Sequence, residues 1–182
     1  LNLIMSWFGL SGWGKSWSLL DVFSDFARYR GITLDINNVV FSISDALKLV
    51  ENVEKGSVII LDEQTKTAGI GATIEKNALK NIELTVRAHR LCLGFSSPEE
   101  VPHNYHYMFQ TYSWGNDEPI DLDRDIAEQW KFTKLIIFNE NRTPLGYVIT
   151  DTPDDSNFLK KYEKKKDENI YAIRQQYGGG RY

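Results

Sequence analysis

The sequence predicts a single α/β domain built on a mostly parallel sheet with helices on both faces. Short apolar runs alternate along the chain with segments whose apolar residues recur at helical spacing. This alternation is typical of parallel strands joined by right-handed crossover helices. Two more apolar runs, 132–138 and 145–150, flank a polar turn and predict a β-hairpin at the sheet edge. A helix from about residue 157 completes the expected fold.

The first four expected elements are a strand, a helix, a second strand and a second helix. The run at 3–8 is apolar and short, as in a buried strand, and 17–28 has apolar residues at helical spacing. A second strand is expected at 38–42. The helix expected at 46–53 is amphipathic and follows Ser44, which with the next residue can cap its N-terminus.

The next elements surround a second apolar run. Val58–Leu61 is apolar throughout, as in a parallel strand buried on both faces. A small, glycine-containing loop is expected at 64–73 and a helix at 74–86. Strands are expected at 89–95 and 105–112. Together these segments continue the alternation of strand and helix that defines the fold class.

Length and composition agree with one globular unit. The chain has 182 residues, of which 42% are hydrophobic, and its net charge is −4. We expect one domain at 1–175, with a core at 1–115, a C-terminal hairpin and helix at 128–175, and a disordered tail at 176–182. The net charge argues against a surface coated with nucleic acid but leaves room for a local basic channel.

The single cysteine and the hydropathy pattern bear on the compartment. Cys92 lies in an apolar run, so we expect a buried strand residue. One cysteine cannot form a disulfide within the chain, which fits a reducing compartment. No apolar run approaches the about 20 residues of a membrane helix. We therefore expect a cytoplasmic protein without a membrane segment in this chain.

A glycine-rich motif follows the first expected strand and opens the first expected helix. Residues 9–16 match the pattern of glycine, four residues, glycine, lysine and serine, which binds phosphates. Backbone N–H groups wrap the phosphates at a helix N-terminus. Lys15 is expected to reach the β- and γ-phosphates, and Ser16 to ligate Mg²⁺. The expected nucleotide-binding residues are Gly9, Leu10, Ser11, Gly12, Trp13, Gly14, Lys15, Ser16 and Trp17.

Two carboxylates end the second apolar run. Asp62 and Glu63 follow Val58–Leu61 directly. Ligands of parallel sheets bind beyond the carboxyl ends of the strands, so both carboxylates are expected beside the glycine-rich turn. Asp62 would organise the Mg²⁺ shell, and Glu63 would act as general base on the attacking water.

These motifs and their order resemble the additional-strand catalytic-glutamate NTPases. Within that group, residues 1–115 are most similar to the FtsK/HerA branch of DNA translocases, conjugation ATPases, viral genome-packaging ATPases and filamentous-phage assembly ATPases. The resemblance implies a P-loop fold of RecA/FtsK type, in which 9–16 and 57–63 are the Walker A and Walker B motifs. It further implies that ATP and Mg²⁺ are cofactors, that subunits assemble into a ring, and that double-stranded DNA is a partner.

The resemblance also implies roles for residues outside the two Walker motifs. The strand between Walker A and Walker B usually ends in a polar sensor, and we assign this role to Ser97 of the pair Ser96-Ser97. Arg87 and Arg90 stand where such families carry arginine fingers that act on a neighbouring subunit's nucleotide. The loop at 66–71 corresponds to a pore loop that could contact DNA.

The lysines of the C-terminal helix allow two interpretations. They are interspersed with acidic residues, which favours a solvated face with salt bridges. A contact with DNA phosphates is the alternative. The lysines are Lys160, Lys161, Lys164, Lys165 and Lys166, and the acidic residues are Asp154, Asp155, Glu163, Asp167 and Glu168.

Three functions remain open at this point. The first is a Mg²⁺-dependent ATPase acting as an oligomeric motor that translocates or packages viral or plasmid DNA. The second is a nucleotide or small-molecule kinase, which would need several lid arginines, whereas 99–125 contains only Arg124. The third is an ATP-binding assembly factor of phage or pilus type. The chain lacks a guanine-reading motif of the Asn-Lys-x-Asp type, which favours ATP over GTP.

Overall fold

The computed structural model describes residues 2–10, 14–62, 70–97, 105–113, 133–150 and 156–177. Its strands are β1 (Leu3–Phe8), β2 (Val39–Val40), β3 (Val58–Leu61), β4 (Cys92–Ser97), β5 (Tyr107–Ser113), β6 (Thr133–Asn139) and β7 (Pro144–Thr150). Its helices are α1 (Lys15–Arg30), α2 (Ile43–Asn52), α3 (Ile70–Ala88) and α5 (Ser156–Tyr177), with a 3₁₀ helix η1 (Ile36–Asn38).

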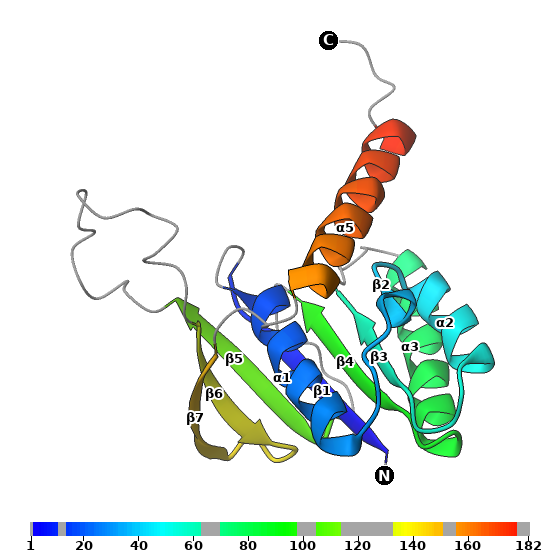
Figure 1. Cartoon of the computed structure of the whole chain (residues 1–182). Coiled ribbons are helices and arrows are strands. Elements are labelled where there is room, and N and C mark those ends of the chain that lie inside the picture. The colour runs from blue at the N-terminus through cyan, green and yellow to red at the C-terminus, as the bar shows by residue number, and fades with distance from the viewer. Residues whose placement is uncertain are drawn as a thin grey trace, which may run out of the picture.

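The strands form one seven-stranded sheet in the order β2-β3-β4-β1-β5-β6-β7 (Figure 1). The pairs β2–β3, β3–β4, β4–β1 and β1–β5 are parallel, whereas β5–β6 and β6–β7 are antiparallel. The structure thus confirms the mostly parallel α/β sheet and the hairpin at its edge. Strand β4 lies between β1 and β3, so the strands that precede the two candidate motifs are not direct neighbours.

Helices cover both faces of the sheet, as expected (Figure 1). On one face, α1 and α5 pack on the sheet through side chains that include Phe23 and Phe158. On the other face, α2 and α3 contribute residues such as Val50 and Ile82 to a second buried cluster. Because side chains alternate along a strand, Ile60 faces α1 while its neighbours in β3 face α2 and α3.

Several boundaries differ from the sequence prediction, and three elements begin three or more residues away from their expected start. Helix α2 begins before the expected cap, because Ser42 is the N-cap: its hydroxyl accepts a hydrogen bond from the Asp45 N–H at 3.1 Å. Helix α3 begins at Ile70, so the expected loop does not extend to residue 73. Strand β4 begins three residues after the predicted start at residue 89, because Arg90 has a φ of 56° and lies in a turn.

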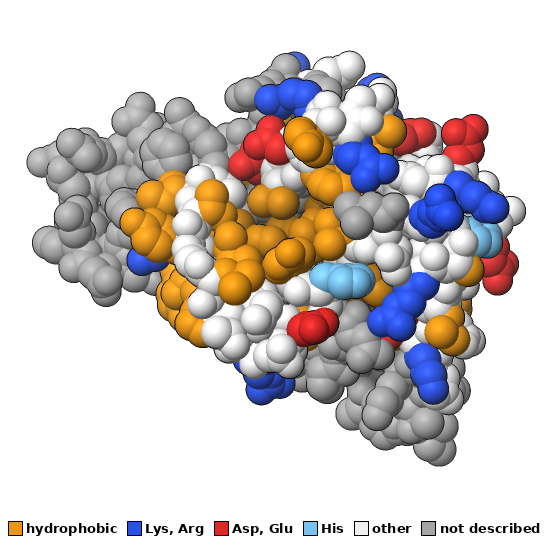
Figure 2. Space-filling model, turned by 90° about the horizontal axis from the view of Figure 1, so that it is seen from below, with side chains coloured by type: hydrophobic (Ala, Val, Ile, Leu, Met, Phe, Trp, Pro, Cys, Tyr) orange, Lys and Arg blue, Asp and Glu red, His pale blue; other side chains and the backbone are white. Residues whose placement is uncertain are grey.

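The hairpin leaves β7 as an edge strand with exposed apolar side chains. Leu145, Tyr147 and Ile149 are 56%, 65% and 44% exposed. Figure 2 shows hydrophobic side chains gathered over part of the surface seen from below. The ammonium of Lys134 lies 4.9 Å from the centre of the Tyr147 ring, so a cation covers one face of this exposed aromatic side chain.

Gly94 allows α1 to approach the centre of the sheet. A Cβ at this position would lie 2.1 Å from Cε2 of Phe23 and 2.7 Å from Cδ1 of Leu19. Both neighbours are fully buried, so neither side chain can move aside without disturbing the core. We expect Gly94→Ala to lower the free energy of unfolding by about 1–3 kcal/mol, measured by urea denaturation at constant m-value.

Gly31 provides the matched control for this prediction. It has a φ of 67°, and a Cβ there would meet nothing within 4 Å. Asparagine tolerates this backbone conformation. Gly31→Asn should therefore change the stability by less than about 1 kcal/mol, and equal effects of the two substitutions would contradict the packing explanation.

Cys92 is buried on β4, as the sequence predicted. Burial raises the pKa of its thiol, and Arg30 only partly opposes this shift. A raised pKa leaves little thiolate at pH 8, and the buried sulfur is hard to reach. We expect Ellman's reagent to label Cys92 only after denaturation. Labelling of the native protein at the rate of a free thiol would contradict this placement.

Candidate nucleotide and metal site

The described part of the glycine-rich turn has the backbone that a close turn requires. Gly14 has a φ of 73° and is the N-cap residue of α1. A Cβ on Gly14 would lie 2.0 Å from Oγ1 of Thr133, so glycine is needed for both conformation and space. Residues Ser11, Gly12 and Trp13 lie outside the described part of the chain.

The side chain of Lys15 bonds to the backbone of the glycine-rich turn. Its ammonium donates hydrogen bonds to the carbonyl oxygens of Gly9 at 2.9 Å and Leu10 at 2.8 Å. The side chain therefore folds back across the space between the end of β1 and the start of α1. This position keeps a positive charge at a helix N-terminus, where an anion would bind.

The structure brings the two expected metal ligands together. Asp62 follows β3, and only 1% of it is exposed. The hydroxyl of Ser16 donates a hydrogen bond to Oδ1 of Asp62 at 3.0 Å. Although 46 positions separate these residues in sequence, the fold places them in direct contact. Glu63 lies outside the described residues, so its expected position stays a prediction.

On β4, Ser96 rather than Ser97 reaches Asp62. The hydroxyl of Ser96 donates to Oδ1 of Asp62 at 2.6 Å. Gly94, two residues earlier, faces α1, and alternation places Ser96 on the same face. Ser97 is also buried, at the end of the strand, and its sensor role stays a prediction.

Helix α5 contributes two residues to this site that the sequence interpretation did not assign to it. The hydroxyl of Tyr162 donates to Oδ2 of Asp62 at 2.5 Å. The ammonium of Lys166 forms a salt bridge with the same oxygen at 3.4 Å. It also lies 3.4 Å from Oγ of Ser16 and 3.2 Å from the Tyr162 hydroxyl.

The expected solvated lysine face is therefore wrong for two of the five lysines. Lys166 is 22% exposed and points to Asp62. Lys165 donates to the carbonyl oxygens of Ile36 at 3.0 Å and Val39 at 2.6 Å. Burial lowers the pKa of Lys165, while Asp35 and Asp45 oppose the shift.

The sequence carried a signal for the inward face of α5. Phe158, Tyr162 and Lys166 recur every four residues and so lie on one side of the helix. The two aromatics are 7% and 1% exposed. Trp17 meets the Tyr162 ring edge-on at 5.7 Å, which ties this face to the start of α1.

The candidate arginine fingers lie at the other end of the sheet. Arg87 is in the last turn of α3, and Arg90 is in the turn before β4. Strand β4 has 6 residues, so roughly 20 Å separate Arg90 from the end of the strand beside Asp62. Arg90 lines a pocket of about 550 Å³ with Arg30 and Lys55. Within one chain, the structure does not bring either arginine to Ser16 and Asp62.

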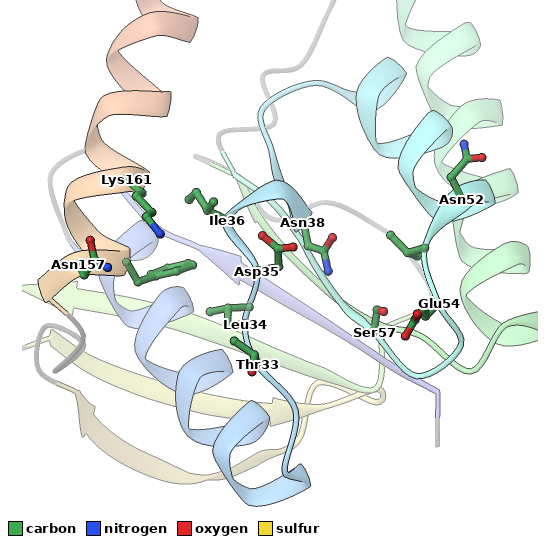
Figure 3. Close-up of a pocket in the computed structure, with 12 residues that line it drawn as sticks. Thr33, Leu34, Asp35, Ile36, Asn38, Asn52, Glu54, Ser57, Asn157 and Lys161 are labelled. Carbon is green, nitrogen blue, oxygen red and sulfur yellow. The ribbon is translucent and has the colours of Figure 1, made fainter.

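A separate pocket lies beside the beginning of α5 (Figure 3). It has a volume of about 580 Å³, and its described lining includes Asp35, Asn38, Glu54 and Lys161. Lys165 fixes one wall by holding the chain around η1 against α5. The lining does not include Asp62, so this hollow is distinct from the site built by the two motifs.

The chemistry of the paired residues suits Mg²⁺. A serine hydroxyl and a buried carboxylate are hard oxygen donors, 3.0 Å apart. Mg²⁺ typically uses one or two protein oxygens, with phosphates and water supplying the rest. The described residues contain no cluster of three or more His, Cys, Asp or Glu side chains that could hold a metal alone. This donor set therefore fits a metal that arrives with a nucleotide.

Comparison with protein-family models found no match, and comparison with curated proteins found none either. The residues and their geometry therefore carry the functional interpretation. Among the helices of the described residues, none combines the length and apolarity needed to cross a membrane.

Proposed function

We propose that this protein is a Mg²⁺-dependent ATPase of the P-loop type. The observation that carries the proposal is the contact between Ser16 and Asp62 at 3.0 Å, because it joins the two sequence motifs into one site. The position of β4 between β1 and β3 supports the grouping with additional-strand NTPases. The left-handed Gly14 and the helix start behind it support phosphate binding at the same place.

In this proposal each residue has a separate task. Lys15 leaves the carbonyls of Gly9 and Leu10 and neutralises the β- and γ-phosphates. Ser16 and Asp62 hold Mg²⁺, which supplies charge neutralisation at the phosphates when bound. Glu63 accepts a proton from the attacking water. The water oxygen bonds to the γ-phosphorus as the bond from that phosphorus to the departing ADP breaks.

We further propose that the ATPase works as an oligomeric motor on double-stranded DNA, as in translocation or genome packaging. The placement of Arg87 and Arg90 supports a shared site, since both lie far from Asp62 in their own chain. As fingers they would serve a neighbouring subunit, where such arginines are worth about 10³- to 10⁵-fold in rate. An isolated subunit would then hydrolyse ATP slowly.

The experiment that tests this function is ATP hydrolysis measured against protein concentration, with and without double-stranded DNA. A steeper than linear rise, together with stimulation by DNA, is the expected result. Activity that rises linearly with protein concentration and is unaffected by DNA would contradict the motor proposal. A monomeric ATPase or kinase would then be the remaining interpretation. If the protein neither binds nor hydrolyses ATP at any concentration, the proposed ATPase activity is wrong.

A further inference from the structure

The carboxylate of Asp62 has a full set of hydrogen-bond donors from the protein itself. Among the described residues, Ser16 and Ser96 donate to Oδ1, whereas Tyr162 and Lys166 donate to Oδ2. An ionised carboxylate offers about four lone-pair sites. An Mg²⁺ ion bound by Asp62 must therefore take the place of one of these donors.

Of the four donors, Lys166 is the one that can be replaced. Ser96 lies on a central strand, and Ser16 is itself an expected metal ligand. Lys166 is on a long, flexible side chain and keeps 22% of its surface exposed. Its replacement requires that the ammonium leave Asp62, Ser16 and the Tyr162 hydroxyl and move toward solvent.

Electrostatic repulsion between Lys166 and Mg²⁺ also favours the departure of Lys166. The Lys166 ammonium is 3.4 Å from Oγ of Ser16. An Mg²⁺ ion bound at about 2.1 Å from that oxygen would lie at most about 5.5 Å from the ammonium. Two cations this close repel each other, and the buried setting of Asp62 weakens the screening by solvent.

We propose that Lys166 is a built-in competitor of Mg²⁺, which neutralises Asp62 without nucleotide and leaves it when Mg–ATP binds. This inference rests on the proposed function and adds a regulatory role for α5 in the same site. Tyr162 bonds to both Asp62 and Lys166, so it links the position of the helix to the state of the metal site. Nucleotide binding is thereby coupled to the C-terminal helix.

The test compares how strongly Mg²⁺ promotes nucleotide binding in three variants. The affinity for a fluorescent, non-hydrolysable AMP-PNP is measured in Mg²⁺ and in EDTA. The readout is the dissociation constant in EDTA divided by the dissociation constant in Mg²⁺. Lys166→Gln removes the charge but keeps a donor for Asp62. It should raise the ratio by about tenfold. Lys166→Arg keeps the charge and should leave the ratio near that of the wild type.

Lys164→Gln is the matched control on the same helix, because Lys164 is 78% exposed and pairs only loosely with Glu168. Its ratio should match the wild type. An unchanged or lower ratio for Lys166→Gln, or an equal rise for Lys164→Gln or Lys166→Arg, would overturn the competition. If the wild type binds no AMP-PNP in either buffer, the proposed function fails. If it binds normally and only the expected ratio is missing, the competition alone fails.

Discussion

Glu63→Gln should retain ATP binding and lose hydrolysis by roughly 10²- to 10⁴-fold. The amide keeps the size of the side chain and one acceptor oxygen, but it cannot accept the proton of the attacking water. Glu63 follows Asp62 directly, and Asp62 lies in contact with Ser16 at the start of α1. Single-turnover hydrolysis and nucleotide titration, performed on the same preparation, separate the chemical step from binding.

Glu51→Gln is the control for this substitution. Glu51 lies on α2, where its side chain is exposed, and it belongs to neither motif. Its rate should equal that of the wild type. Hydrolysis by Glu63→Gln at the wild-type rate would exclude Glu63 as the general base. Loss of binding along with hydrolysis would assign it a structural role instead.

Lys15→Ala should weaken ATP binding by about 10- to 100-fold, because it removes charge-assisted hydrogen bonds to the phosphates. Lys15 donates hydrogen bonds to the backbone carbonyl oxygens of Gly9 and Leu10 in the turn, at 2.9 and 2.8 Å. These bonds hold the ammonium near the helix N-terminus. A titration with labelled ATP in the presence of Mg²⁺ measures the loss.

Lys48→Ala is the matched lysine control. Lys48 lies on α2, is 75% exposed and forms a surface ion pair with Asp45 at 3.5 Å. Such pairs contribute little to stability, and this one is remote from the motifs in sequence. ATP affinity equal to the wild type is expected for Lys48→Ala. The same affinity for Lys15→Ala would show that the glycine-rich turn does not bind phosphate as proposed.

The fold class and half of the site could be predicted from the sequence, because their signals are local. A continuous apolar run such as Val58–Leu61 predicts a buried parallel strand wherever it occurs. The glycine-rich pattern predicts a turn and a helix start, and α1 begins at Lys15. The rule that ligands gather at strand carboxyl ends was enough to place Ser16 beside Asp62.

The partners of Asp62 beyond Ser16 were decided by the tertiary structure. Whether Ser96 or Ser97 reaches the carboxylate depends on which face of β4 meets α1, and a shift of one residue reverses it. Tyr162 lies 100 residues from Asp62 in sequence, and its hydrogen bond exists only because α5 returns to the α1 face of the sheet. The sequence by itself determined that the helix exists and carries lysines. Only packing decided that the side of α5 carrying Tyr162 and Lys166 meets Asp62, because a buried carboxylate requires a nearby cation and hydrogen-bond donors.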